Sequence, residues 1–156
     1  MESAQQKIKN QIEKLLALMG VSGSIAIEDR EGHLYFNIRT EDSNMLIGQY
    51  GQNLNSLQHI ARLLVRAENA KENPEQEETR FSVDVEDYRK NREEFLEALA
   101  RKAASRVRET QQSLILKPMS SYERRVIHEK LSASDDLITE SIGEGPERRV
   151  VIKLKV

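Results

Sequence analysis

Apolar side chains recur along this chain with two different spacings. Steps of three and four place side chains on one face of a helix, and they occur in residues 5–19, 52–64, 88–112 and 121–131. Strict alternation places neighbours on opposite faces of a strand, and it occurs in residues 24–28, 33–39, 81–86 and 148–156. Because both spacings run through the whole chain, the pattern predicts an α+β protein.

Residues 45–64, MLIGQYGQNLNSLQHIARLL, place two glycines just before a predicted helix. Gly48 and Gly51 have no Cβ, so the loop can turn tightly and its backbone can lie close to a ligand. The free N–H groups at the start of the following helix add a seat for phosphate. The alternative is an ordinary turn, because a bare Gly-x-x-Gly is a weak signal. Four residues share the apolar face of this helix: Leu54, Leu57, Ala61 and Leu64.

Short alternating runs flank this stretch. Residues 24–28 and 33–39 predict two strands joined by a hairpin-like turn at residues 29–32. Residues 68–78 are charged and lack periodicity, so they predict an exposed loop before a third strand at residues 81–86. The second strand has one apolar face, made by Leu34, Phe36 and Ile38.

A helix over residues 5–19, ended by Gly20 as its C-cap, precedes these strands. The resulting order is helix, strand, strand, short helix, Gly-x-x-Gly, helix, strand. This order resembles a KH domain of the bacterial type II arrangement, a three-stranded sheet with helices on one face. The resemblance implies that the Gly-x-x-Gly loop clamps the backbone of about four nucleotides.

The second half of the chain predicts two helices and three short strands. The helix over residues 88–112 carries many basic side chains, which can be a solvated face or a binding face. Ser120 and Glu123 form a capping box at the start of the helix over residues 121–131. The apolar face of the first helix contains Phe95, Leu96, Leu99, Ala103 and Val107. The strands are expected at residues 114–116, 137–141 and 148–156, with a tight turn at 143–146.

Arg124 and His128 lie four positions apart on the second of these helices, so both project from one face, and Arg125 lies beside them. Alone, such a pair is commonly an ordinary surface feature. The surrounding sequence is more specific, because it closely resembles the Arg-x-x-x-His domain, called R-three-H, of single-stranded nucleic-acid binders. The segments that carry the resemblance are residues 117–128, 139–141, 143–145 and 148–153.

A KH domain at residues 1–87 followed by an R-three-H α/β domain at residues 88–156 resembles the Jag/KhpB family of bacterial RNA-binding proteins. The resemblance implies binding of single-stranded RNA, with single-stranded DNA left open. It also implies an RNA chaperone or post-transcriptional regulator linked to cell shape and division, and a small single-KH partner protein, KhpA. Carried over by position, the RNA-binding residues are Gly48, Gln49, Tyr50, Gly51, Arg124, Arg125, His128 and Arg148.

The sequence departs from this family in two places. Family loops commonly carry basic residues where this chain has Gln49 and Tyr50, so we expect weaker phosphate binding and a shallower salt dependence. Tyr50 either stacks on a base or packs on its own domain. Many members begin with an additional small domain, whose function we expect to be missing here unless the sequence is a short form. A Gly51→Asp change is expected to weaken RNA binding without unfolding, because its carboxylate would lie where phosphate sits.

Composition limits the alternatives. Of 156 residues, 38% are hydrophobic and 32% are charged, which predicts small cores. There is no cysteine, no secretory signal and no apolar run long enough to span a membrane, so we expect a cytoplasmic protein. The three histidines are scattered and lack metal-ligand spacing. We therefore expect no metal, no cofactor, no small-molecule substrate and no enzymatic activity.

Charge is distributed unevenly around a net value of −2. Residues 1–86 carry 9 Lys and Arg against 14 Asp and Glu, whereas residues 87–156 carry 15 against 12. The second half is thus the better electrostatic partner for phosphate. The acidic first half leaves a second hypothesis open, a protein-interaction scaffold that makes no direct contact with nucleic acid.

Overall fold

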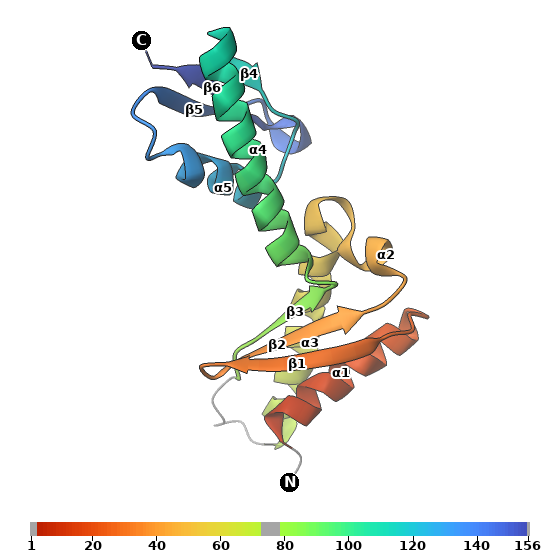
Figure 1. Ribbon diagram of the computed structural model, residues 1–156. Coiled ribbons are helices and arrows are strands. Elements are labelled where there is room, and N and C mark those ends of the chain that lie inside the picture. Colours follow the sequence, from red (N-terminus) through yellow and green to blue (C-terminus); the bar gives the residue numbers. More distant parts are fainter. Residues whose placement is uncertain (1–2, 73–78, 156) are drawn as a thin grey trace. The chain divides into compact units, whose positions relative to one another are not determined.

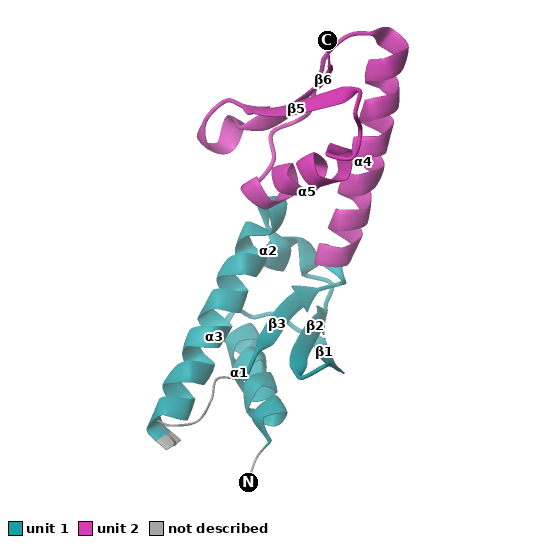
Figure 2. Cartoon of the chain, turned by 90° about the vertical axis from the view of Figure 1, so that its left-hand side faces the viewer, with its two compact units in different colours: residues 1–88 teal, residues 89–156 magenta. Residues whose placement is uncertain are grey.

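A computed structural model describes residues 3–72 and 79–155. The chain is a mixed α+β protein that divides into two compact units, residues 1–88 (unit 1) and residues 89–156 (unit 2) (Figure 2). Each unit has one three-stranded sheet and its own hydrophobic core. The helix and strand classes expected from the two spacings are both present.

Helix α1 (Ala4–Leu18) begins and ends on local hydrogen bonds. The Ser3 hydroxyl accepts the N–H of Gln6 at 3.2 Å, which makes Ser3 the N-cap. At the other end Gly20, with a φ of 71°, follows the C-cap Met19, and the Val21 N–H bonds the Leu16 carbonyl at 2.9 Å. This is a Schellman ending, so Gly20 terminates the helix one position beyond the C-cap itself.

The first sheet has the order β1-β2-β3 (Figure 1). Strands β1 (Ser24–Arg30) and β2 (His33–Arg39) form an antiparallel hairpin, and β3 (Phe81–Val85) pairs with β2 in parallel. The hairpin turn is two residues long rather than the expected four, because Glu31 and Gly32 both adopt positive φ, 53° and 81°. Such a turn matches the twist of the strands and lets β1 continue to Arg30.

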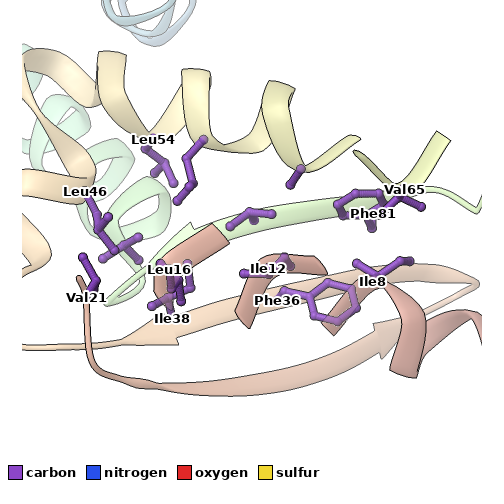
Figure 3. Close-up of a cluster of buried hydrophobic side chains, with 14 of the residues drawn as sticks. Ile8, Ile12, Leu16, Val21, Phe36, Ile38, Leu46, Leu54, Val65 and Phe81 are labelled. Carbon is purple, nitrogen blue, oxygen red and sulfur yellow. The ribbon is translucent and has the colours of Figure 1, made fainter. Parts of the chain in front are cut away.

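Helices α1 and α3 cover one face of this sheet. The inward side chains of β2 are fully or nearly buried, as the alternation predicted. Figure 3 shows them meeting residues of both helices in one cluster: Ile8, Ile12, Leu16, Phe36, Ile38, Leu54, Val65 and Phe81. Burial of each large apolar side chain contributes on the order of 1.5–3 kcal/mol, so this cluster is the main stabilising feature of unit 1.

Helix α3 (Gln52–Glu72) follows the short helix α2 (Ser43–Ile47) and differs from its prediction in two respects. Leu64 is 38% exposed, and Val65 occupies the inward position instead, because a helix turns 3.6 residues at a time and position 65 continues the stripe from Ala61. The helix also continues to Glu72, so the loop expected from residue 68 begins later. Residues 73–78 of that expected loop lie outside the described residues.

Unit 2 packs its two long helices against an antiparallel sheet of order β4-β6-β5. Its elements are α4 (Tyr88–Thr110), β4 (Leu114–Ile115), α5 (Ser121–Leu131), β5 (Leu137–Ile142), the 3₁₀ helix η2 (Gly145–Glu147) and β6 (Arg149–Leu154). The expected final strand is therefore shorter at both ends, and Val156 lies outside the described residues.

The prediction of the apolar face of α4 is wrong at one position. Phe95 is 54% exposed, and its ring lies under the guanidinium of Arg92 at 5.1 Å. The buried stripe runs through Leu96, Ala100 and Val107. Since neighbouring helical residues are rotated by about 100°, a stripe centred on Leu96 leaves Phe95 at its edge.

Candidate nucleic-acid interface

The glycine loop, Gly48–Gly51, connects α2 to α3 through a single 3₁₀ turn, η1 (Gln49–Gly51). Gly48 adopts φ 69° and ψ −173°, a conformation that essentially only glycine takes. Tyr50, at φ 54° and ψ 27°, is left-handed, which is uncommon for a residue with a large side chain. The backbone of the loop is therefore held in an unusual shape rather than in an ordinary turn.

Close packing explains why both ends of the loop are glycine. A Cβ on Gly48 would lie 2.5 Å from the Asn53 side chain, whose amide donates to the Met45 carbonyl at 2.8 Å. A Cβ on Gly51 would lie 2.9 Å from the Tyr88 ring, and Gly51 has a φ of 76°. A Gly51→Asp change would therefore strain the backbone and displace the Tyr88 ring, which adds a stability cost to the expected loss of RNA binding.

The loop offers a ligand its backbone rather than any charge. Gln49 is exposed, Tyr50 is half-buried, and neither carries a charge at neutral pH. Helix α3 starts directly after the loop and is 21 residues long, so its N-terminus contributes a partial positive charge. The Gly48 and Gly51 N–H groups already bond the Asn44 and Gly48 carbonyls at 3.0 and 3.4 Å, so it is the dipole of α3 that favours an anion such as phosphate there.

The second candidate region begins with a firmly fixed helix end. The Ser120 hydroxyl accepts the Glu123 N–H at 3.3 Å, and Glu123 accepts the Ser120 N–H at 2.8 Å, which confirms the predicted capping box. Glu123 is only 2% exposed and also accepts from Arg92 Nε of α4 at 2.6 Å. This ion pair, in which Glu123 is buried and Arg92 is partly exposed, links the start of α5 to α4.

Arg124 is positioned by two contacts that leave part of its guanidinium available. Its Nη1 donates to the Met119 carbonyl at 2.7 Å, and its Nη2 lies 3.3 Å from Ser121 Oγ. A guanidinium has five N–H donors in a planar fork, so further donors can bind a phosphate or a base edge. The contacts reduce the side-chain entropy that binding would otherwise cost.

His128 lies one turn further along α5 and joins it to strand β5. Its Nδ1 is 2.7 Å from Thr139 Oγ1, and its Nε2 is 2.9 Å from Ser141 Oγ. Burial, and then the nearby charge of Arg124, lowers the pKa of His128 below its ordinary value of 6.5. At neutral pH the ring is therefore neutral with both nitrogens engaged, so what it presents to a ligand is its aromatic face.

The two other predicted arginines have different surroundings. Arg125 is exposed and pairs with Glu129 through a 2.7 Å contact. Arg148 is exposed, and its carbonyl accepts the Met119 N–H at 3.2 Å. Since Arg124 binds the carbonyl of the same Met119, the Arg148 backbone and the Arg124 side chain contact one residue across 24 positions of sequence. We call Arg124 and His128 the Arg-His face.

Sequence reasoning missed the residues that support the Arg-His face. Met119, Thr139 and Ser141 hold the Arg124 and His128 side chains, yet none was named as part of a site. All three lie in segments that carried the resemblance to the R-three-H domain, residues 117–128 and 139–141, and this was the available signal. The sequence did not show which helix packs against Thr139 and Ser141.

Two absences concern only the part of the chain that the structure describes. Within residues 3–72 and 79–155, no group of three His, Cys, Asp or Glu side chains is arranged to hold a metal ion. None of the helices in those ranges has the length and apolar character needed to cross a bilayer.

The fold and the Arg-His face of unit 2 define the class of this domain. Residues 94–154 match the family model of the R-three-H domain. This range contains α5, β5 and β6 with the residues that hold Arg124 and His128.

Comparison with known proteins extends the assignment to the whole chain. The chain is similar to the RNA-binding protein KhpB of Clostridium symbiosum, with 36% identity over 156 residues that cover 99% of this chain and 68% of that protein. It is 33% identical over 152 residues to RNA-binding protein KhpB of Bacillus subtilis, covering 96% and 70%. It is 28% identical over 154 residues to RNA-binding protein KhpB of Lactiplantibacillus plantarum, covering 99% and 46%. The chain belongs to the KhpB family.

Proposed function

We propose that this protein binds single-stranded RNA through two surfaces, the glycine loop of unit 1 and the Arg-His face of unit 2. The observation that carries the proposal is the held guanidinium of Arg124 beside the aromatic face of His128. A fixed cation with spare donors and a flat ring can contact a phosphate and stack on a base, the two chemistries of single-strand binding. The relatives named RNA-binding protein KhpB support this function.

For unit 1 we propose the type II KH arrangement. The supporting observations are the element order α1-β1-β2-α2-α3-β3, the parallel pairing of β2 with β3, and the glycine loop before α3. In this arrangement the loop holds the sugar-phosphate backbone while unstacked bases lie along the adjoining groove. Gln49 and Tyr50 add no charge, so the loop would hold RNA through close approach of its glycine backbone and the dipole of α3.

The finer role is proposed from the family resemblance. We propose an RNA chaperone or post-transcriptional regulator in the cytoplasm, linked to cell shape and division, with a small single-KH partner protein. The chain would act by binding and would not catalyse a reaction. Single-stranded DNA remains an alternative ligand, because stacking and phosphate contacts do not require a 2′-hydroxyl.

The direct test is fluorescence anisotropy with a labelled single-stranded RNA pool at two salt concentrations. We expect Arg124→Ala to weaken binding by roughly 10- to 100-fold, since a charge-assisted contact contributes about 1.5–3 kcal/mol. Arg101→Ala, which removes one charge from a 3.4 Å pair with Glu97 on α4, is the matched control. Equal affinity of Arg124→Ala and Arg101→Ala would exclude the Arg-His face as the RNA site.

The same titration separates RNA binding from a scaffold function. The scaffold hypothesis is favoured by the acidic composition of residues 1–86 and the uncharged glycine loop. Binding of RNA through several cations must weaken steeply as salt rises, because phosphate neutralisation releases counterions. Absence of RNA binding at low salt would favour the scaffold.

A further inference from the structure

A cavity of about 420 Å³ lies in unit 1 between the second half of α3 and the start of β3. We call it the basic pocket. Its lining includes three arginines and two histidines: Arg62, Arg66, Arg80, His33 and His59. Among the residues that the structure describes, no aspartate or glutamate lines it.

This concentration of basic groups runs against the charge of the unit that contains it. Residues 1–86 have only 9 Lys and Arg against 14 Asp and Glu, and three of those nine line the basic pocket. Both histidines of that segment line it too. The segments that supply them are separate in sequence, namely α3, the start of β2 and the residues entering β3. The fold therefore gathers basic side chains that are dispersed in the sequence.

Hydrogen bonds between α3 and β3 hold residues of the basic pocket in place. Strand β3 is at the edge of its sheet, and α3 side chains satisfy its outer polar groups, with Gln58 accepting the Val83 N–H at 3.1 Å. Arg62 Nη2 donates to the Phe81 carbonyl at 2.9 Å, which holds the guanidinium near the Phe81 ring. Val65 and Phe81, which lie beside each other in Figure 3, form an apolar part of the lining.

His33 and Arg80 also line the basic pocket, and the two are held in different ways. His33 Nε2 is 2.8 Å from Ser82 Oγ, so the imidazole is oriented by its neighbouring strand. The Arg80 side chain is exposed, while its carbonyl accepts the Leu34 N–H at 3.1 Å and so fixes its backbone to β2. Asn69 and Thr79 add an amide and a hydroxyl to the lining.

We infer that the basic pocket binds a phosphate group, as a second anion site of unit 1 that is separate from the glycine loop. Guanidinium groups bind phosphate through forked, charge-assisted hydrogen bonds, which Arg62 and Arg80 on this lining can supply. Arg62 is ten residues along α3 from Gln52, about 15 Å at the helical rise, so the loop and the pocket cannot hold the same phosphate.

The phosphate can be an internal phosphodiester of a strand already held by the glycine loop, or a terminal phosphate monoester. The chemistry of recognition is the same for both carriers. The assignment of the carrier as RNA rests on the proposed function, whereas phosphate binding by the pocket does not.

The first experiment uses inorganic phosphate and the full isotope-labelled chain. We expect saturable NMR shifts at residues 59–66 and 79–81 when phosphate replaces chloride at constant ionic strength. Arg80→Glu should weaken this binding roughly tenfold, because it replaces an attractive charge by a repulsive one. Lys14→Glu on α1 makes the same charge change in unit 1 at an exposed position away from the pocket, and should leave the affinity nearly unchanged. Scattered, non-saturating shifts, or equal effects of the two variants, would overturn the inference.

The second experiment identifies the carrier with two RNAs of one sequence, ending in a phosphate or in a hydroxyl. A terminal site predicts tighter binding of the phosphorylated RNA by several-fold, lost in Arg80→Glu. An internal site predicts equal binding of the two RNAs, both weakened by Arg80→Glu and not by Lys14→Glu. Saturable phosphate binding without any RNA binding would keep the pocket and refute the proposed function. RNA binding with no response to inorganic phosphate or to Arg80→Glu would do the reverse.

Discussion

The glycine loop and the Arg-His face are built in opposite ways. The loop presents backbone atoms in a conformation that two glycines permit, with the uncharged Gln49 and Tyr50 between them. The Arg-His face presents side chains on a regular helix, each held by hydrogen bonds to Met119, Thr139 or Ser141. The glycine loop therefore depends on the absence of a Cβ at two positions, whereas the Arg-His face depends on the hydrogen bonds that hold its two side chains.

Because of this difference, the two regions should be sensitive to different substitutions and should contribute differently to the salt dependence of RNA binding. A backbone site tolerates changes of Gln49 but not a Cβ at Gly48. A side-chain site depends on its supporting residues as much as on the arginine itself. Since counterion release counts cationic contacts, most of the salt dependence of RNA binding should come from outside the glycine loop.

The largest expected effect concerns the support of the Arg-His face. Arg92→Ala leaves the carboxylate of Glu123, 2% exposed, without its cation. We expect unit 2 to lose about 3 kcal/mol of unfolding free energy, because an uncompensated buried charge is costly. Hydrogen exchange of unit 2 amides measures this loss separately from unit 1. Arg101→Ala on the same helix should have little effect, and similar losses for both variants would contradict the role of the pair.

The next effect concerns the support of the glycine loop. Gly48→Ala should cost about 2 kcal/mol of unit 1 stability, since it combines an unfavourable backbone with a contact on Asn53. Gly32→Ala is the matched control, because Gly32 has a φ of 81° and open space around it. Denaturant unfolding should show a larger loss for Gly48→Ala. If Gly32→Ala lowers the stability of unit 1 by as much, the contact with Asn53 does not contribute to the effect of Gly48→Ala.

A smaller, favourable effect should follow from adding charge to the loop. Gln49→Lys places an ammonium at an exposed position of the loop. We expect RNA affinity to rise severalfold at low salt and the salt slope to steepen by about 0.7, the value for one added contact to a single strand. Gln5→Lys on α1 adds the same charge at another exposed position of unit 1. An equal gain from Gln5→Lys would mean that only net charge had acted.

The smallest effect is the pH dependence that His128 gives to unit 2. Its pKa is lowered in the folded state, so below its ordinary value of 6.5 the unfolded state binds more protons. Stability is therefore full above that value and falls as the pH drops through it towards the folded pKa. We expect melting temperatures to decline from pH 7.5 to 5.5 and to decline less in His128→Gln. Identical declines would show that His128 does not carry the effect.

Some features could be predicted because they depend on residues close in sequence. The Ser120–Glu123 capping box, the Gly20 helix ending and the two-stranded hairpin all involve neighbours within a few positions. The glycine loop could also be predicted, since its conformation depends on the two glycines themselves. Its packing could not be predicted, because Tyr88, whose ring lies against Gly51, is 37 positions away.

The amino-acid pattern alone established the alternation of helices and strands, the glycine loop and the shared helix face of Arg124 and His128. Tertiary structure decided that Val65 rather than Leu64 turns inward, that Thr139 and Ser141 hold His128, and that dispersed basic residues line one pocket. The reason is physical. Periodicity and capping act over three or four residues, whereas the partner of an outward or inward side chain depends on which distant element packs against it.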